Sequence, residues 1–153
     1  MDAALPAARL ILSSSISFNP VLDTMAPKAM VYIRGDEPLK RKIARDISPL
    51  PHLDMDCPPG IVCFGTADAL LDIAVPFIEK AETMGIRMEL LTARDMPLGF
   101  FNPSPWQETV IKASDEFLIS LGYLSGPPTI QTRNGATLKK ETLPRRPATK
   151  ANH

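Results

Sequence analysis

The sequence predicts an α/β fold with about three parallel strands flanked by helices. Three short runs have the composition of strands, at residues 10–18, 60–64 and 88–91. Helix-like patterns lie between and after them, and this alternation is typical of a parallel sheet with crossover helices. A length of 153 residues suits one modest domain with a single core.

The second strand-like run is the clearest of the three. Its sequence, GIVCF, is apolar almost without interruption, whereas a strand with one solvated face would alternate. We therefore expect residues 60–64 to form a parallel strand that helices cover on both faces. Pro58-Pro59 before it and Gly65 after it mark its ends.

The first crossover helix is predicted over residues 70–84. Apolar residues recur there at intervals of three and four, with charged residues on the opposite side. Gly85 follows as a natural stop. We expect Asp72 to cap the amino end of this helix, which would place Pro76 near the first turn, where the missing N–H of proline matters least.

Two further helices are predicted. Residues 105–121 carry an apolar stripe that ends at Gly122, and residues 38–47 form a shorter, basic and mostly exposed candidate. These stripes are most simply interpreted as core, and no cofactor is expected. Cys57 and Cys63 are spaced too widely for a zinc half-site, so no metal is expected either.

The charge of the chain is divided between a body and a tail. Residues 133–153 carry six Lys and Arg against one Glu, while residues 1–132 carry 11 basic and 16 acidic side chains. The tail has few residues able to bury apolar area, so the entropy cost of ordering it would not be repaid. We therefore predict a folded unit over residues 1–130 and a disordered basic tail over residues 131–153. The overall charge of zero gives no reason to expect a nucleic-acid partner.

Targeting signals are weak in this sequence. No apolar run approaches the ~20 residues that span a membrane, so no membrane partner is expected. The N-terminus carries Asp2, and its apolar run at residues 10–12 is too short for a secretory signal. The absence of a signal favours a cytoplasmic location, although a missing N-terminus could have carried one.

Two loops of this sequence are predicted to meet at one edge of the sheet. Right-handed crossovers bring the carboxyl ends of parallel strands together there, and catalytic and binding groups of α/β proteins gather at that edge. One loop follows the second strand and contains Asp68; the other follows the third strand and reads PLGFFN at residues 97–102. About 30 residues separate them, the length of a strand–helix–strand unit, so we expect them to lie side by side.

The motifs at these positions resemble the C-terminal half of an α/β-hydrolase of the esterase/lipase group. In that family the segment reads P-P, then G-T-x-D, a helix, a strand and G-H-G-F-F-N. The resemblance covers roughly residues 16–130 and implies a partial α/β-hydrolase fold with the last three strands of its sheet. The matching residues are Pro58-Pro59, Gly65-Thr66 with Asp68, Gly99-Phe100-Phe101-Asn102, Asn19-Pro20-Val21-Leu22-Asp23, Ile47-Ser48-Pro49, Glu116-Phe117-Leu118 and Ser120-Leu121-Gly122-Tyr123-Leu124.

The resemblance implies a role for Asp68. In the family a Ser nucleophile, an acid and a His follow one another along the chain; the His takes the proton of the serine, and the acid orients the His. Asp68 occupies the position of the acid. Its local sequence also allows a simpler role, in which it caps or turns the chain before a helix. The position of the His is occupied by Leu98, which can neither accept nor donate a proton.

No other residue of the sequence replaces the missing groups. His52 precedes the second strand and is expected at the surface or in packing, and His153 ends the predicted tail. Asp95 lies close to Leu98, but a carboxylate is a poor general base towards a serine hydroxyl. The sequence contains neither a G-x-S-x-G nucleophile motif nor a His-Gly-Gly run for an oxyanion hole.

We therefore expect a truncated relative of carboxylesterases and lipases that is inactive alone. Two alternatives remain open. The chain could be half of a split esterase, the only case in which a small ester substrate is expected, or a non-catalytic binding module with a pocket wall around Asp68, Phe100 and Phe101. In addition, the first strand would have lost its inner neighbour in the sheet, and its exposed apolar edge is expected to cause self-association.

Overall fold

The structure is a computed structural model that describes residues 9–12, 34–132 and 135–143. Its elements are β1 (Arg9–Leu12), α2 (Glu37–Ile47), a 3-10 helix (Leu50–His52), β2 (Gly60–Gly65), α3 (Leu71–Thr83), β3 (Met88–Ala93), α4 (Trp106–Ser120) and β4 (Leu138–Glu141). This alternation confirms the predicted α/β class. Within the described ranges, no helix combines the length and the apolar character needed to cross a bilayer.

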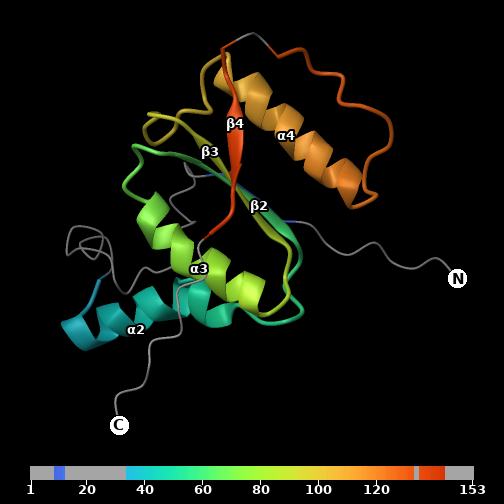
Figure 1. Cartoon of the computed structure of the whole chain (residues 1–153). Helices are drawn as coiled ribbons and strands as arrows, with labels where there is room; N and C mark the ends of the chain where they lie inside the picture. Colours follow the sequence, from blue (N-terminus) through green and yellow to red (C-terminus); the bar gives the residue numbers. More distant parts are fainter. Residues whose placement is uncertain (1–8, 13–33, 133–134, 144–153) are drawn as a thin grey trace, which may run out of the picture.

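The four strands form one mixed sheet in the order β1-β2-β3-β4 (Figure 1). β1, β2 and β3 are parallel, as predicted, and β4 runs antiparallel to β3. β1 ends at Leu12, and the remainder of the first predicted run, residues 13–18, lies outside the described residues.

β4 corrects the predicted extent of the disordered tail. The composition of residues 131–153 predicts no fixed structure, yet Leu138–Glu141 form a strand that pairs with β3 from Leu90 to Ala93. The physical reason is that an open strand edge offers a row of backbone hydrogen bonds, which composition alone does not reveal. A side-chain contact adds to them, because Thr92 Oγ1 donates to Glu141 Oε1 at 2.7 Å. Residues 144–153 of the predicted tail lie outside the described residues.

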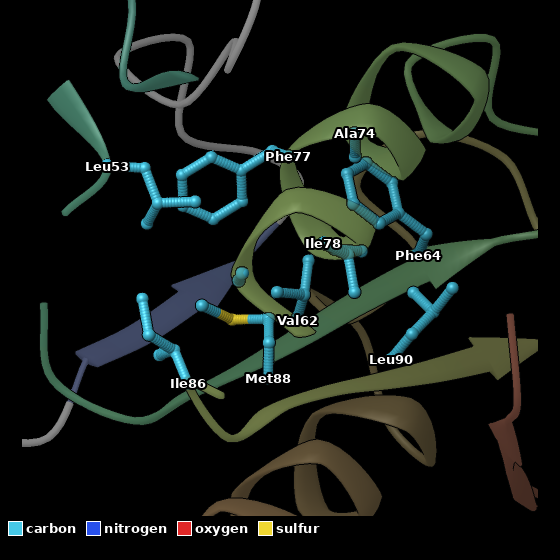
Figure 2. Close-up of a cluster of buried hydrophobic side chains, with 10 residues drawn as sticks. Leu53, Val62, Phe64, Ala74, Phe77, Ile78, Ile86, Met88 and Leu90 are labelled. Atoms are coloured by element: carbon cyan, nitrogen blue, oxygen red, sulfur yellow. The ribbon is translucent and has the colours of Figure 1, made fainter. Parts of the chain in front are cut away.

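α3 covers one face of the sheet, and its buried side chains form the larger of two core clusters (Figure 2). Phe77 is 1% exposed, and burial of such a side chain stabilises the fold by about 1.5–3 kcal/mol. The residues of this cluster on α3 are Ala74, Phe77, Ile78 and Ala81, and they pack against Val62 and Phe64 of β2 and Met88 and Leu90 of β3. The apolar stripe predicted for residues 70–84 is thus confirmed as core.

α4 covers the opposite face, with a second cluster beneath it. Val110 and Phe117 of α4 are buried there with Ile61 and Cys63 of β2. Since alternate residues of β2 enter the two clusters, all six of its residues are buried. The continuous apolar run therefore has the origin that the sequence predicts.

The start of α3 differs from the prediction. Asp72 lies in the first turn instead of at the cap, the cap position is taken by Leu70, and Pro76 lies inside the helix. The prediction of Asp72 as the cap is wrong because Asp68, further upstream, already shapes the entry to the helix. Its carboxylate oxygen Oδ1 accepts a hydrogen bond from the N–H of Leu70 at 2.9 Å.

Candidate functional site

The loops that follow β2 and β3 are joined by hydrogen bonds at the carboxyl edge of the sheet. The N–H of Thr66 donates to the carbonyl of Ala93 at 2.9 Å, and the N–H of Ala67 donates to that of Met96 at 3.0 Å. Asp95, whose φ is +57°, donates its N–H to Thr66 Oγ1 at 2.7 Å. The predicted juxtaposition of the two loops is confirmed by these contacts.

Gly65 permits the close approach of these loops. A β carbon at this position would lie 1.8 Å from the carbonyl oxygen of Met96 and 2.4 Å from its carbonyl carbon. Real β carbons essentially never come within 3.0 Å of such atoms. The glycine of the G-T-x-D motif is therefore required because two backbone segments touch.

Asp68 is hydrogen-bonded to its neighbours at this edge and is only 6% exposed. One carboxylate oxygen, Oδ1, accepts from the N–H of Leu70, and the backbone N–H of Asp68 donates to the carbonyl of Gly65 at 3.1 Å. The other oxygen, Oδ2, is buried and has no hydrogen-bond partner among the described residues. Asp68 thus shapes the turn before α3 with one oxygen, while its second oxygen accepts no hydrogen bond from the described part of the chain.

Leu98 occupies the turn that follows β3 and is 53% exposed. The turn closes around it, because the N–H of Phe100 donates to the carbonyl of Pro97 at 3.3 Å. Gly99 has a φ of +77°, and its carbonyl accepts from Asn102 Nδ2 at 3.1 Å. An exposed leucine therefore stands where the resemblance implies a catalytic histidine.

Phe100 and Phe101 follow Leu98 in the loop after β3, and both rings lie in the core. They are 2% and 6% exposed and belong to the core cluster beneath α4. Phe100 packs edge-on against both Phe101 and Trp106, with ring centroids 5.4 Å apart in each pair. The expected pocket wall around Asp68, Phe100 and Phe101 stays a prediction, and the structure shows that the loop turns both rings inward to cover the sheet.

His52 lies far along the fold from Asp68. It belongs to the 3-10 helix that precedes β2, whereas Asp68 follows β2, so the length of the strand separates them. The His52 ring atom Nε2 lies 2.6 Å from the carbonyl oxygen of Asp46. His52 is exposed, as expected, and His153 lies outside the described residues.

Metal binding depends on how the described His, Cys, Asp and Glu side chains are grouped, and thiol reactivity depends on how far each cysteine is buried. Among the described residues, no three His, Cys, Asp or Glu side chains are grouped so that they could hold a metal ion. Cys57 and Cys63 are both free thiols. Burial raises the pKa of Cys63 to about 12, so this thiol stays protonated and unreactive.

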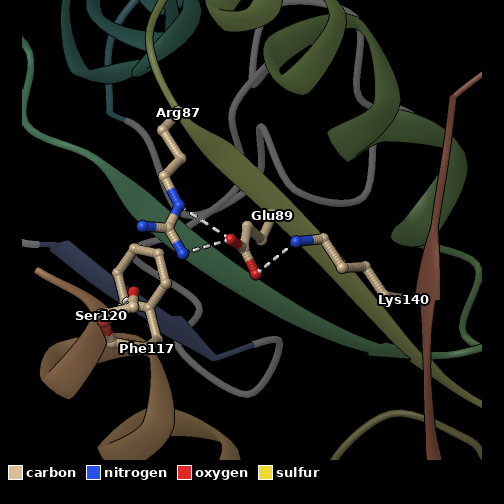
Figure 3. Close-up of polar contacts among 5 residues, drawn as sticks. All are labelled: Arg87, Glu89, Phe117, Ser120 and Lys140. Carbon is tan, nitrogen blue, oxygen red and sulfur yellow. Dashed lines mark hydrogen bonds and ion pairs between the residues drawn. The ribbon is translucent and has the colours of Figure 1, made fainter.

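Three charged side chains join β3 to β4 in a cluster that the sequence does not predict (Figure 3). Glu89 Oε1 accepts from Arg87 Nη2 at 2.6 Å, and Glu89 Oε2 lies 3.0 Å from Lys140 Nζ. The Arg87 guanidinium lies 5.0 Å from the ring centroid of Phe117 on α4. Burial alone would raise the pKa of Glu89, but the hydrogen bonds from Lys140 and Arg87 outweigh it and hold the pKa below its usual value.

Only part of this cluster could have been found in the sequence. Arg87 directly precedes β3 and Glu89 is its second residue, so their spacing of two favours the same face of an extended segment. Lys140 belongs to the segment that the composition predicts as disordered, so nothing in the sequence predicted its contact with Glu89.

The fold is similar to solved structures of an esterase from Thermogutta terrifontis. The propionate-bound structure has a TM-score of 0.60 and 26% identity, and the match covers 79% of this chain and 45% of that chain. The esterase phosphorylated by paraoxon gives a TM-score of 0.57 and 28% identity, with 78% and 42% covered. The apo form gives 0.58 and 26%, with 78% and 44% covered. This chain therefore spans less than half the length of the esterase chains that it matches.

Neither a protein-family model nor a curated protein matches the chain. The assignment depends on the similarity of the fold to the solved esterases, at 26–28% identity and TM-scores of 0.57–0.60. The chain has the fold of the C-terminal half of an α/β-hydrolase of the esterase group.

Proposed function

We propose that these 153 residues form the acid-bearing half of an esterase-like scaffold and do not hydrolyse esters by themselves. The similarity to solved esterases supports a hydrolase-like scaffold at the level of the family. Asp68 is proposed as the residue in the position of the triad acid. The reaction of the complete scaffold would be hydrolysis of a carboxylic ester, through a serine nucleophile activated by histidine.

The observation that carries this proposal is the state of Asp68. Its Oδ2 is buried without a partner among the described residues, at the edge where parallel sheets place their chemistry. Buried carboxylate oxygens are normally hydrogen-bonded, so an unused one indicates a position where a donor fits. In the esterase triad that donor is an imidazole N–H, but here the residue at the histidine position is Leu98.

The catalytic groups that the sequence lacks support the proposal that the chain does not hydrolyse esters by itself. Acyl transfer needs a nucleophile, a base that takes its proton and N–H donors for the oxyanion. The 153 residues contain no G-x-S-x-G, and His52 lies at the far end of β2. An acid that orients a base has no catalytic effect when the base is absent.

A split esterase is the second candidate, and the unpaired Oδ2 of Asp68 is the observation that favours it. A partner chain that supplied serine, histidine and oxyanion donors would find an acceptor already in place. Leu98 counts against this candidate, because in the resembling family the histidine belongs to the same half as the acid.

The test is hydrolysis of p-nitrophenyl acetate by the purified 153-residue chain. We expect the wild type, Asp68→Asn and Asp68→Ala to release p-nitrophenol at the same rate as buffer with an inactive protein. Asp68→Asn is the matched variant, because its amide oxygen can still accept from Leu70 while the carboxylate charge is lost. Turnover by the wild type that both variants abolish would contradict the proposal.

The variant Leu98→His separates a missing histidine from a missing nucleophile. We expect it to restore no turnover, because the serine is still absent. The side chain at position 98 is 53% exposed, so the substitution should leave the fold intact. Activity in this variant alone would show that the chain carries a nucleophile that its motifs do not reveal.

A further inference from the structure

We propose that a cavity between α4 and β4 binds a small organic carboxylate through its head group and a short apolar body. The cavity has a volume of about 270 Å³ and lies away from the loops that carry Asp68 and Leu98. Its walls come from one face of α4, from the paired strands β3 and β4, and from Thr132, Ala136 and Thr137 in the segment before β4. The proposal is independent of the ester chemistry discussed above.

The floor of the cavity is apolar. Leu91 of β3 belongs to the core cluster beneath α4, and Ala113 and Leu138 pack against that cluster. Leu138 and Lys140 stand on the same face of β4, because they are two residues apart on a strand. Lys140 pairs with Leu91 in the antiparallel register, which brings its side chain to the α4 side of the sheet.

Two lysines face the cavity from opposite walls. Lys112 and Glu116 lie on the face of α4 that lines it, and Lys140 comes from β4. Lys112 Nζ is 3.9 Å from Glu116 Oε1, which is too long for a hydrogen bond. Lys112 therefore retains hydrogen-bonding capacity for a ligand.

The second lysine belongs to a cluster with an excess of positive charge. Lys140 shares the carboxylate of Glu89 with Arg87, so two cations meet one anion there (Figure 3). The charge of Glu116 balances that of Lys112, and Glu116 is the one carboxylate among the described residues that line the cavity. The net charge around the cavity therefore favours an anion.

The size and polarity of the cavity select the ligand class. Pockets for drug-sized molecules have volumes of about 300–1,000 Å³, so this cavity of about 270 Å³ suits a molecule smaller than most drugs. A carboxylate accepts charge-assisted hydrogen bonds from ammonium groups, and a short hydrocarbon chain can cover the apolar floor. A neutral amide of the same shape lacks the charge, and an amine would meet two lysines.

The probes are valerate and valeramide, which have the same shape and differ in charge. Binding to the 153-residue chain would be followed by the shifts of backbone amide resonances in NMR titrations up to about 20 mM, well above a Kd of about 1 mM. The test variant is Lys112→Gln, whose side chain is 43% exposed, so its replacement should not unfold the helix. Lys42→Gln is the control, because Lys42 lies on α2 and pairs with Asp46 there.

We expect saturable shifts from valerate at the amides of Leu91, Ala113 and Leu138, with no saturable shifts from valeramide. Lys112→Gln should weaken valerate binding about tenfold, equivalent to about 1.4 kcal/mol, and Lys42→Gln should leave it unchanged. Any one of three results would overturn the proposal: no saturable shift at these amides, equal binding of valeramide, or equal affinity in Lys112→Gln.

Discussion

Replacement of Gly65 by alanine tests how tightly the two loops at the carboxyl edge are packed. The new β carbon would lie 1.8 Å from the carbonyl oxygen of Met96, so the loop after β3 must move by about 1 Å or more to reach ordinary contact. That movement breaks the hydrogen bond from Ala67 to Met96 and strains the one from Asp95 to Thr66. Overpacking costs about 1–3 kcal/mol and a lost hydrogen bond about 1 kcal/mol, so we expect a loss of about 2–4 kcal/mol.

The assay is urea denaturation followed by the fluorescence of Trp106 and by far-ultraviolet circular dichroism. Gly85→Ala is the matched control, because Gly85 has a φ of +77° but nothing within 4 Å of the added β carbon. Its cost should be that of the left-handed conformation alone, about 1 kcal/mol. If Gly65→Ala proved as stable as Gly85→Ala, the inferred contact between the loops would be wrong.

Three further predictions follow from the core, the charged cluster and the sheet edge. Phe77→Ala should lower the free energy of unfolding by about 3–5 kcal/mol in urea denaturation, whereas Met55→Ala, at a 78% exposed side chain, should change it by less than about 0.5 kcal/mol. The pKa of Glu89 is held below 4.5, so the stabilisation that its carboxylate provides is present above that pH and should be lost as the pH falls below it. Thermal unfolding should therefore show a smaller loss of stability over this pH range in Glu89→Gln than in the wild type. In the described residues β1 pairs on one side only, and we propose that its other edge causes self-association, so that light scattering should show dimers or larger species; a monodisperse monomer would contradict this.

The parts of the fold that the sequence predicts are those with a local signal. GIVCF has no polar interruption because both of its faces are buried, and the stripe over residues 70–84 has the period of the helix that packs on it. β4 has no such signal. Its four residues, LKKE, are polar and form a strand only because the edge of β3 accepts them.

The candidate site likewise has features that the sequence predicts and features that it does not. The distance along the chain between Asp68 and the loop of Leu98 equals one strand–helix–strand unit, so topology alone predicts that the loops meet. Three facts depend on packing and could not be predicted: the unused Oδ2 of Asp68, the inward turn of Phe100 and Phe101, and the pairing of Lys140 with Glu89. None of the three has a periodic pattern in the sequence that could have predicted it.

In the part of the chain that the structure describes, the contacts that position Asp68 are local to the carboxyl edge of the sheet. Gly65 and Leu70 fix its backbone and one oxygen, and the contact of Met96 with Gly65 fixes the neighbouring loop. A partner chain would therefore meet a preformed acceptor and would need to bring the remaining groups. Leu98 then decides where the histidine comes from. If mixing with a serine-bearing partner gives activity only with Leu98→His, the base belongs to this chain's own loop; if the wild-type pair is already active, the partner supplies the base.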